Sequence, residues 1–224
     1  FGLLNRRDQP STGPLIVMRL IIPAALVAAA FAPLPTPFAS AEAQQVSPAY
    51  TFLKAVEDRD GTKATSMLQT PSNRVVNAQR SSDGKTAMHM VVERRDSTWI
   101  TFLLANKADP NIGDRNGDTP LMLATQLGYL DGMELLLKYG GKVDESNRAG
   151  ETPLIRAVQL RDSEAIRLLM KNGANPNITD HASGRSALDY AKLDRRSSDL
   201  VDLLQNKPAA KAESEGELDF SGIK

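Results

Sequence analysis

The sequence has no cysteine, two histidines and one tryptophan among its 224 residues. The absence of cysteine excludes disulfides, thiolate metal sites, iron–sulfur clusters and a cysteine nucleophile. Two histidines are too few for a three-histidine catalytic metal site. Neither sign of charge is in excess, because 27 basic residues balance 27 acidic ones. No global field therefore attracts the chain to nucleic acid or to anionic lipid, and we expect no nucleic-acid partner.

Catalytic motifs are missing as well. From residue 42 onward the sequence contains no glycine-rich phosphate loop, no G-x-S-x-G nucleophile elbow and no H-E-x-x-H metal motif. Paired carboxylates such as Glu57-Asp58 fall in helical patterns with exposed charge, so nothing places an acid opposite a nucleophile. We expect no catalytic residue, no cofactor and no metal ion. A hydrolase is a remote alternative that rests only on scattered acidic residues.

Residues 18–41 contain the three regions of a secretory signal peptide. Arg19 precedes a thirteen-residue apolar run (20–32), and a proline-rich stretch then ends in Ala39-Ser40-Ala41. The run is shorter than the roughly 20 residues that a membrane-spanning helix needs. We expect cleavage near Ala41 or Ala43, no stable membrane insertion afterwards, and a periplasmic or secreted mature protein. We interpret residues 1–17, which precede a plausible start at Met18, as a non-native or mis-assigned extension.

The remainder of the chain repeats with a period of about 33 residues. Gly84, Gly117 and Gly150 follow one another at this interval, and Gly184 comes one position later than the interval predicts. A second slot, two positions after each glycine, reads Thr86-Ala87-Met88, Thr119-Pro120-Leu121, Thr152-Pro153-Leu154 and Ser186-Ala187-Leu188. Thr and Ser cap the N-terminus of a helix and Pro suits its first turn. Each repeat is therefore predicted to start a helix just after a glycine turn.

These residues resemble the ankyrin repeat family, whose repeat is a β-turn plus two antiparallel helices and whose mark is T-P-L-H-x-A. Thr119–Ala124 and Thr152–Ala157 match that mark except at its His position. His89 fills the position in the preceding repeat, where Ala87 stands in place of Pro. The resemblance covers about residues 50–205. It implies an all-α solenoid of stacked helix–turn–helix pairs with β-turn tips, and it says little about the partner.

The period also predicts where the repeats begin. We expect an ankyrin domain at 46–205, with an N-terminal cap at 46–80, repeats at 81–113, 114–146 and 147–179, and a C-terminal cap repeat at 180–205. Trp99, Phe102 and Leu103 begin a set of apolar residues that recurs in the second helices, so we expect them in a shared core. From residue 206 to 224 the chain is polar and is expected to be a disordered tail.

Single residues that resemble parts of chemical sites have structural interpretations. His89 occupies the motif position whose His hydrogen-bonds the neighbouring turn in the family. His181 lies in the inserted loop Asp180–Gly184 beside one carboxylate, and we interpret it as a solvated loop residue. Asp114–Asp118 is similar to the start of a calcium loop, but a helix begins at Thr119-Pro120, where a calcium loop needs further ligands.

The resemblance implies that a protein partner binds the β-turn tips and the inner face of each first helix. Carried over by position, the binding residues on the turns are Asp83, Lys85, Arg115, Asn116, Asp118, Arg148, Glu151 and Arg185. Those on the first helices are Glu93, Arg94, Gln126, Leu127, Gln159 and Leu160. Equivalent residues of successive repeats should stack in register, so we expect a row of positive charge (Arg115, Arg148) beside a row of negative charge (Asp118, Glu151).

The signal peptide followed by ankyrin repeats resembles bacterial periplasmic ankyrin repeat proteins. This resemblance implies a non-catalytic protein-binding module in the bacterial periplasm, and we expect a monomer with an unidentified protein partner. Two related roles stay open. The array would support an envelope or stress-response enzyme as an accessory protein, or it would bind a host protein as a secreted effector.

Overall fold

The computed structural model describes residues 47–69, 75–194 and 198–205. The expected signal peptide, the extension at 1–17 and the polar tail lie outside these residues. Within the described ranges the chain forms ten α-helices and one short 3-10 helix, and no strand. In the same ranges, no helix combines the length and the apolar content needed to cross a membrane.

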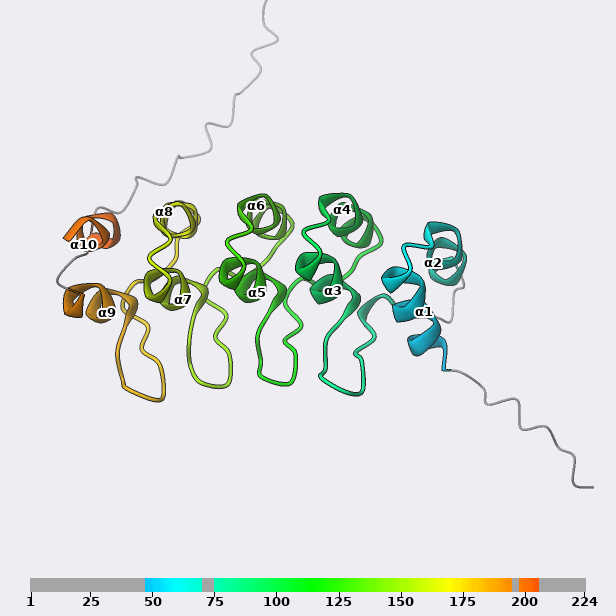
Figure 1. Ribbon diagram of the computed structural model, residues 1–224, viewed down its shortest axis with the longest axis horizontal. Coiled ribbons are helices and arrows are strands. Elements are labelled where there is room, and N and C mark those ends of the chain that lie inside the picture. Colours follow the sequence, from blue (N-terminus) through cyan, green and yellow to red (C-terminus); the bar gives the residue numbers. More distant parts are fainter. Residues whose placement is uncertain (1–46, 70–74, 195–197, 206–224) are drawn as a thin grey trace, which may run out of the picture. The chain divides into compact units, whose positions relative to one another are not determined.

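The helices form five consecutive pairs, one in each predicted repeat or cap. They are α1 (Pro48–Glu57) with α2 (Gly61–Leu68), α3 (Ala87–Glu93) with α4 (Ser97–Ala105), α5 (Pro120–Gln126) with α6 (Leu130–Lys138), α7 (Pro153–Gln159) with α8 (Ser163–Lys171), and α9 (Ala187–Leu193) with α10 (Ser198–Gln205). The 3-10 helix η1 (Val75–Asn77) follows α2. First helices pack against first helices from α1 to α9, and α4, α6, α8 and α10 form a second row (Figure 1). The predicted all-α solenoid is confirmed.

Capping residues fix the start of the helices. The hydroxyls of Thr119 and Thr152 each accept a hydrogen bond of 3.3 Å from a backbone N–H in the first turn of α5 and α7. Asp60, Asp96 and Asp162 cap α2, α4 and α8 in the same way, at 2.9, 3.2 and 3.0 Å. Each cap satisfies a donor that the helix itself leaves free. The same chemistry therefore starts both helices in the repeat of α7 and α8, whereas α6 begins after Tyr129 without a side-chain cap.

The core is continuous from repeat to repeat. Two sets of equivalent residues are completely buried in α4, α6 and α8: Ile100, Met133 and Ile166, and Leu103, Leu136 and Leu169. Trp99 and Phe102 pack against this core but stay partly exposed, with their rings edge to face at 5.1 Å. Leu103 is thus buried as expected, Trp99 and Phe102 lie at the edge of the core, and Ile100, which was not expected there, takes a fully buried slot.

Four turns project from the row of first helices, one before each of α3, α5, α7 and α9 (Figure 1). Polar side chains at the start of the turns organise them. The carboxylate of Asp114 accepts hydrogen bonds from the backbone N–H groups of Asn116 and Asp118, at 2.7 and 3.1 Å. Asn147 does the same for its own turn with two bonds of 3.0 Å. The calcium-like segment is therefore an ordinary turn whose carboxylate serves the backbone.

Neighbouring turns are joined by one backbone hydrogen bond at each junction. The N–H groups of Arg115, Arg148 and His181 donate to carbonyls of the preceding turn, at 2.9, 2.9 and 2.7 Å. The approach is close because glycine lies opposite. A Cβ placed on Gly117 would lie 2.9 Å from the backbone nitrogen of Arg148, and Gly117 also has a φ of +81°. Glycine is therefore required there for its conformation and for the space it leaves.

A pair of glycine substitutions separates these two requirements. Gly173 has a φ of +87° but open space around it, so Gly173→Ala should cost only the positive-φ penalty of about 1–2 kcal/mol. Gly117→Ala should cost that penalty plus about 1–3 kcal/mol for the clash with the next turn. Urea unfolding of both variants measures the difference. Equal losses of stability would show that the turns do not press on one another.

Candidate protein-binding surface

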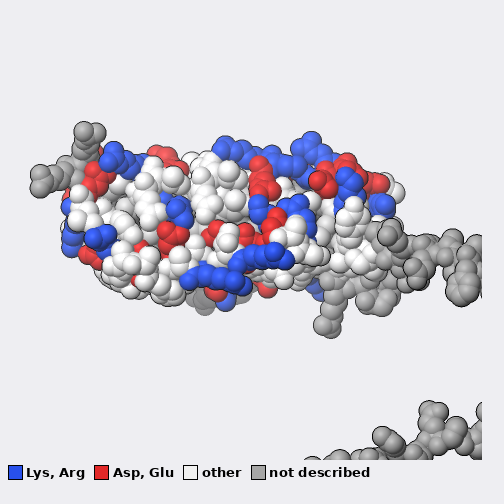
Figure 2. All heavy atoms as spheres, turned by 60° about the horizontal axis from the view of Figure 1, so that its bottom comes forward, with Lys and Arg blue, Asp and Glu red and all other residues white. Residues whose placement is uncertain are grey.

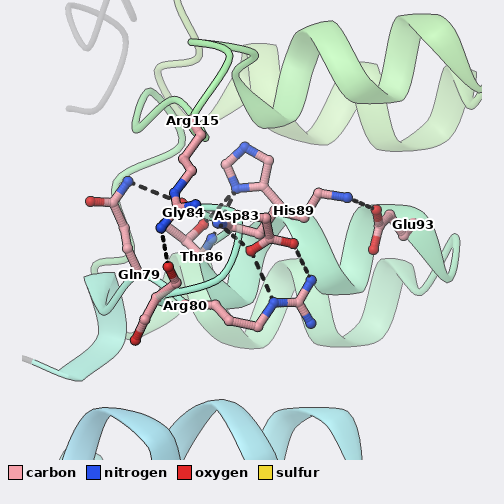
Figure 3. A network of polar contacts seen from close by, with 10 residues as sticks. Gln79, Arg80, Asp83, Gly84, Thr86, His89, Glu93 and Arg115 are labelled. Carbon is pink, nitrogen blue, oxygen red and sulfur yellow. Dashed lines mark hydrogen bonds and ion pairs between the residues drawn. The ribbon is translucent and has the colours of Figure 1, made fainter.

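His89 links the first two turns from inside the array. It is completely buried, and the backbone N–H of Thr86 donates to its Nδ1 at 3.2 Å (Figure 3). Because Nδ1 accepts, the proton lies on Nε2, which is 2.8 Å from the carbonyl oxygen of Asp118. Burial lowers the pKa of His89 and favours this neutral form. The prediction that His89 bonds the neighbouring turn is confirmed.

His181 occupies the same slot on the fourth turn as Arg115 and Arg148 do on the second and third. Its backbone N–H makes the equivalent bond to the preceding turn, and its exposed ring places Nδ1 3.3 Å from the carbonyl oxygen of Arg148. His181 follows Arg148 at the same interval as Arg148 follows Arg115, so the extra residue of this repeat lies between His181 and Gly184. Our interpretation of His181 as part of a solvated insertion missed this place in the row.

The carboxylates on the turns are bonded within the array. Arg80 forms an ion pair with Asp83 and holds the pKa of that carboxyl well below its usual range (Figure 3). Asp118 accepts from the side-chain amide of Asn147 at 2.9 Å. Glu151 pairs with the guanidinium of Arg156 at 2.5 Å. The expected negative row therefore exists as positions in register, and both of its carboxylates accept at least one hydrogen bond from the protein's own donors.

The fourth turn follows the same rule with different donors. The hydroxyl of Tyr190 donates to Asp180 at 2.5 Å, and the backbone N–H of Ser183 donates to it at 2.6 Å. These bonds, the one from Tyr190 first, lower the pKa of Asp180 to about 2.

Lys85 on the first turn pairs with Glu93 at the end of α3. Two of the predicted binding residues thus bind each other.

The arginines at the turn tips differ from the carboxylates. Arg115, Arg148 and Arg185 are exposed, and among the residues that the structure describes none of the three lies within ion-pair distance of a carboxylate. The guanidinium of Arg115 donates to the carbonyl oxygen of Ser81 (Figure 3), which leaves its charge unpaired. Asn116 is exposed beside Arg115.

The inner helices contribute residues with different degrees of exposure. Gln126 and Leu127 are half-buried, whereas Gln159 and Leu160 are exposed, Leu160 by 50%. In the next repeat Leu193, which takes the place that Gln159 has in its own repeat, is 60% exposed. Leu193 was missed by the sequence reasoning, although the register of the last repeat is enough to find it.

Arg94 lies differently from the other predicted binding residues. Its guanidinium donates to the carbonyl oxygens of Val56 and Glu57 in α1, at 2.7 and 3.3 Å, and lies 3.7 Å from Asp96. Burial lowers its pKa. Arg94 therefore ties the N-terminal cap to the next repeat, and we do not include it in the proposed binding surface.

A hollow of about 460 Å³ lies between the first two turns and the inner helices behind them. It brings together six of the predicted binding residues: Asp83, Lys85, Arg115, Asn116, Asp118 and Gln126. Figure 2 shows the face with the turns brought forward, where basic and acidic side chains alternate with uncharged surface. The remaining predicted residues lie outside this hollow: Glu93 and Arg94 at the end of α3, Leu127 directly after α5, and Arg148, Glu151, Gln159, Leu160 and Arg185 on the later repeats.

Comparison with known proteins agrees with the geometry. A family model for three copies of the ankyrin repeat matches residues 52–147, and a model for a single ankyrin repeat matches residues 149–181. An ankyrin repeat protein of Acanthamoeba polyphaga mimivirus is 29% identical over 103 residues, which are 46% of this chain and 14% of that protein. The chain thus aligns with only a small part of the viral relative. The matched repeats, the stacked helical pairs and the joined turns together show that this chain belongs to the ankyrin repeat family.

Proposed function

We propose that this chain is a non-catalytic module that binds a protein partner across its turn tips and inner helices. Ankyrin repeats are protein–protein interaction modules, and the family is now established for residues 52–147 and 149–181. The observation that carries the proposal is the exposure of Arg115, Arg148 and Arg185 without acidic partners among the described residues. Exposed arginines are frequent hot spots in protein interfaces.

The surface also has the mixed character that protein interfaces show. Arg148 and Gln159 offer hydrogen-bond donors, while Leu160 and Leu193 offer apolar area on neighbouring inner helices. Arginine with apolar and aromatic residues is enriched in the buried centre of such interfaces. A catalytic function has less support than protein binding, because His89, the buried histidine, is already bonded on both ring nitrogens.

Replacing two tip arginines tests the binding surface. Arg115→Ala with Arg148→Ala should reduce the amount of partner captured from a periplasmic extract by about tenfold or more, because hot-spot arginines contribute about 2 kcal/mol or more each. Stability should change by less than about 0.5 kcal/mol per exposed site. Quantitative mass spectrometry of the captured proteins measures the loss.

A matched control removes two cations from another face. Arg167→Ala with Lys171→Ala changes exposed residues of α8 by the same total charge and should leave capture unchanged. Equal capture by the tip variant and the control would refute the binding surface. The identity of the captured protein separates a general adaptor from an accessory protein of an envelope enzyme.

We propose a periplasmic location for this module. The support is the pattern of residues 18–41, an Arg, a short apolar run and a small-residue cleavage region, all outside the described residues. Cell fractionation should place the protein in the periplasm with Glu42 or Gln44 at its N-terminus, as measured by intact mass. Recovery from the cytoplasm with residues 18–41 retained contradicts the proposal, and recovery from the medium indicates a secreted effector instead.

A further inference from the structure

The last two turns carry arginine side chains that have no carboxylate partner among the described residues. Arg148 and Arg185 are exposed and lack an ion pair among the described residues, while Glu151 and Asp180 beside them are bonded to Arg156 and Tyr190 at 2.5 Å. The guanidinium groups are thus free for a ligand that brings carboxylates, which they bind at two points.

A segment of the same chain carries such carboxylates. Residues 213–219 contain Glu213, Glu215, Glu217 and Asp219 and no cation. This segment lies outside the described residues, so its contacts are argued here from charge and from the length of chain that leads to it.

The last described helix, α10, ends near the base of the fourth turn. Gln205, the last residue of α10, lines a hollow of about 550 Å³ together with Asn175, Pro176, Asn177 and Leu188. From Asn177 to His181, at the tip of the fourth turn, the chain advances four residues, which span at most about 14 Å. Gln205 is therefore separated from the tip of the fourth turn by at most about 14 Å plus the width of this hollow.

The linker is long enough to cover that distance. Residues 206–212 span up to about 25 Å when extended, and the acidic segment spans up to about 25 Å more. The third and fourth turns are joined by a backbone hydrogen bond, so Arg148 and Arg185 lie on adjacent turns. A segment that reaches Arg185 therefore also reaches Arg148.

We propose that residues 213–219 dock on Arg148 and Arg185 of the same molecule. A short linker gives an effective concentration on the order of millimolar, so a contact with a millimolar dissociation constant already occupies half of the molecules. Asp180 and Asp189 keep their negative charges nearby, which weakens attraction at a distance and makes the docking depend on direct contact. The docked tail competes with a partner for these turns, a consequence that rests on the proposed function.

Paramagnetic NMR on the full chain tests the docking. Because the chain has no cysteine, Ser221→Cys carries a nitroxide at one position only. At about 0.1 M NaCl the nitroxide should broaden the amide signals of residues 147–151 and 180–185 and spare those of α6. Raising NaCl to about 1 M, where the Debye length falls to about 3 Å, should remove the selective broadening.

Charge variants identify the contact. Arg148→Ala with Arg185→Ala should reduce the broadening of both turns to the level of α6, and so should Glu213→Gln, Glu215→Gln, Glu217→Gln and Asp219→Asn together. The control variant Arg167→Ala with Lys171→Ala should show the same selective broadening of both turns as the unchanged protein. Absent broadening, uniform broadening, or selective broadening that survives these variants would overturn the proposal.

A mixed sample excludes a second copy as the source. The sample combines ¹⁵N-labelled protein that carries no nitroxide with spin-labelled protein at natural isotope abundance. The ¹⁵N-labelled protein should show no selective broadening, and selective broadening in this sample would overturn docking within one molecule. Partner capture tests the proposed binding surface independently of the docking. Capture that depends on Arg148 in a chain without selective broadening leaves the proposed function standing and removes only the docking.

Discussion

The structure depends on contact between neighbouring repeats, because no repeat buries its apolar face alone. Ile100, Met133 and Ile166 have no exposed surface, and each lies in a helix that packs on the equivalent helix of the adjacent repeat. Such arrays are stabilised by a sum of nearest-neighbour interfaces rather than by one central core. A constant repeat length is the condition for these interfaces to form one after another.

The same constant length orders the surface. Arg115, Arg148 and His181 follow one another because each backbone N–H donates to the preceding turn, and glycine opposite leaves room for that bond. This backbone bond does not depend on which side chain stands at the three positions, and side chains such as His89 and Asn147 add further bonds between neighbouring turns. The carboxylates on these turns instead take part in holding them, as Asp114 does for its own backbone. On these turns the carboxylates thus hold the structure, whereas the arginines at the tips are left for the binding role that we propose.

The period predicts the fold well and the surface only in part. Glycines at a fixed interval indicate the turns, and the motif position of His89 indicates its bond to the next turn, because both depend on backbone geometry that repeats. Trp99 was expected in the core, but Ile100 is the buried residue, since a single helical step separates them and both are apolar. The period alone does not decide between two such neighbours.

Side-chain direction explains the other differences. Arg94 was placed with the binding residues by its slot, but its long side chain reaches back to α1, where two carbonyl oxygens accept from it. Arg59, Arg95 and Arg161, at the turns within repeats, have φ values of +59°, +55° and +57°, a conformation that favours glycine. The side chains of these arginines contact the next repeat; Arg161, for example, forms a 2.6 Å ion pair with Asp194. No short sequence pattern predicts these contacts.

Amide hydrogen exchange measures the joining of the turns most directly. The amides of Arg115, Arg148 and His181 should be protected although all three residues are exposed, because each donates to the preceding turn. Ser82 occupies the same slot on the first turn, where no earlier turn accepts from it among the described residues, and its amide should exchange fast. Equally fast exchange at all four positions would contradict a surface built from turns that are joined in register.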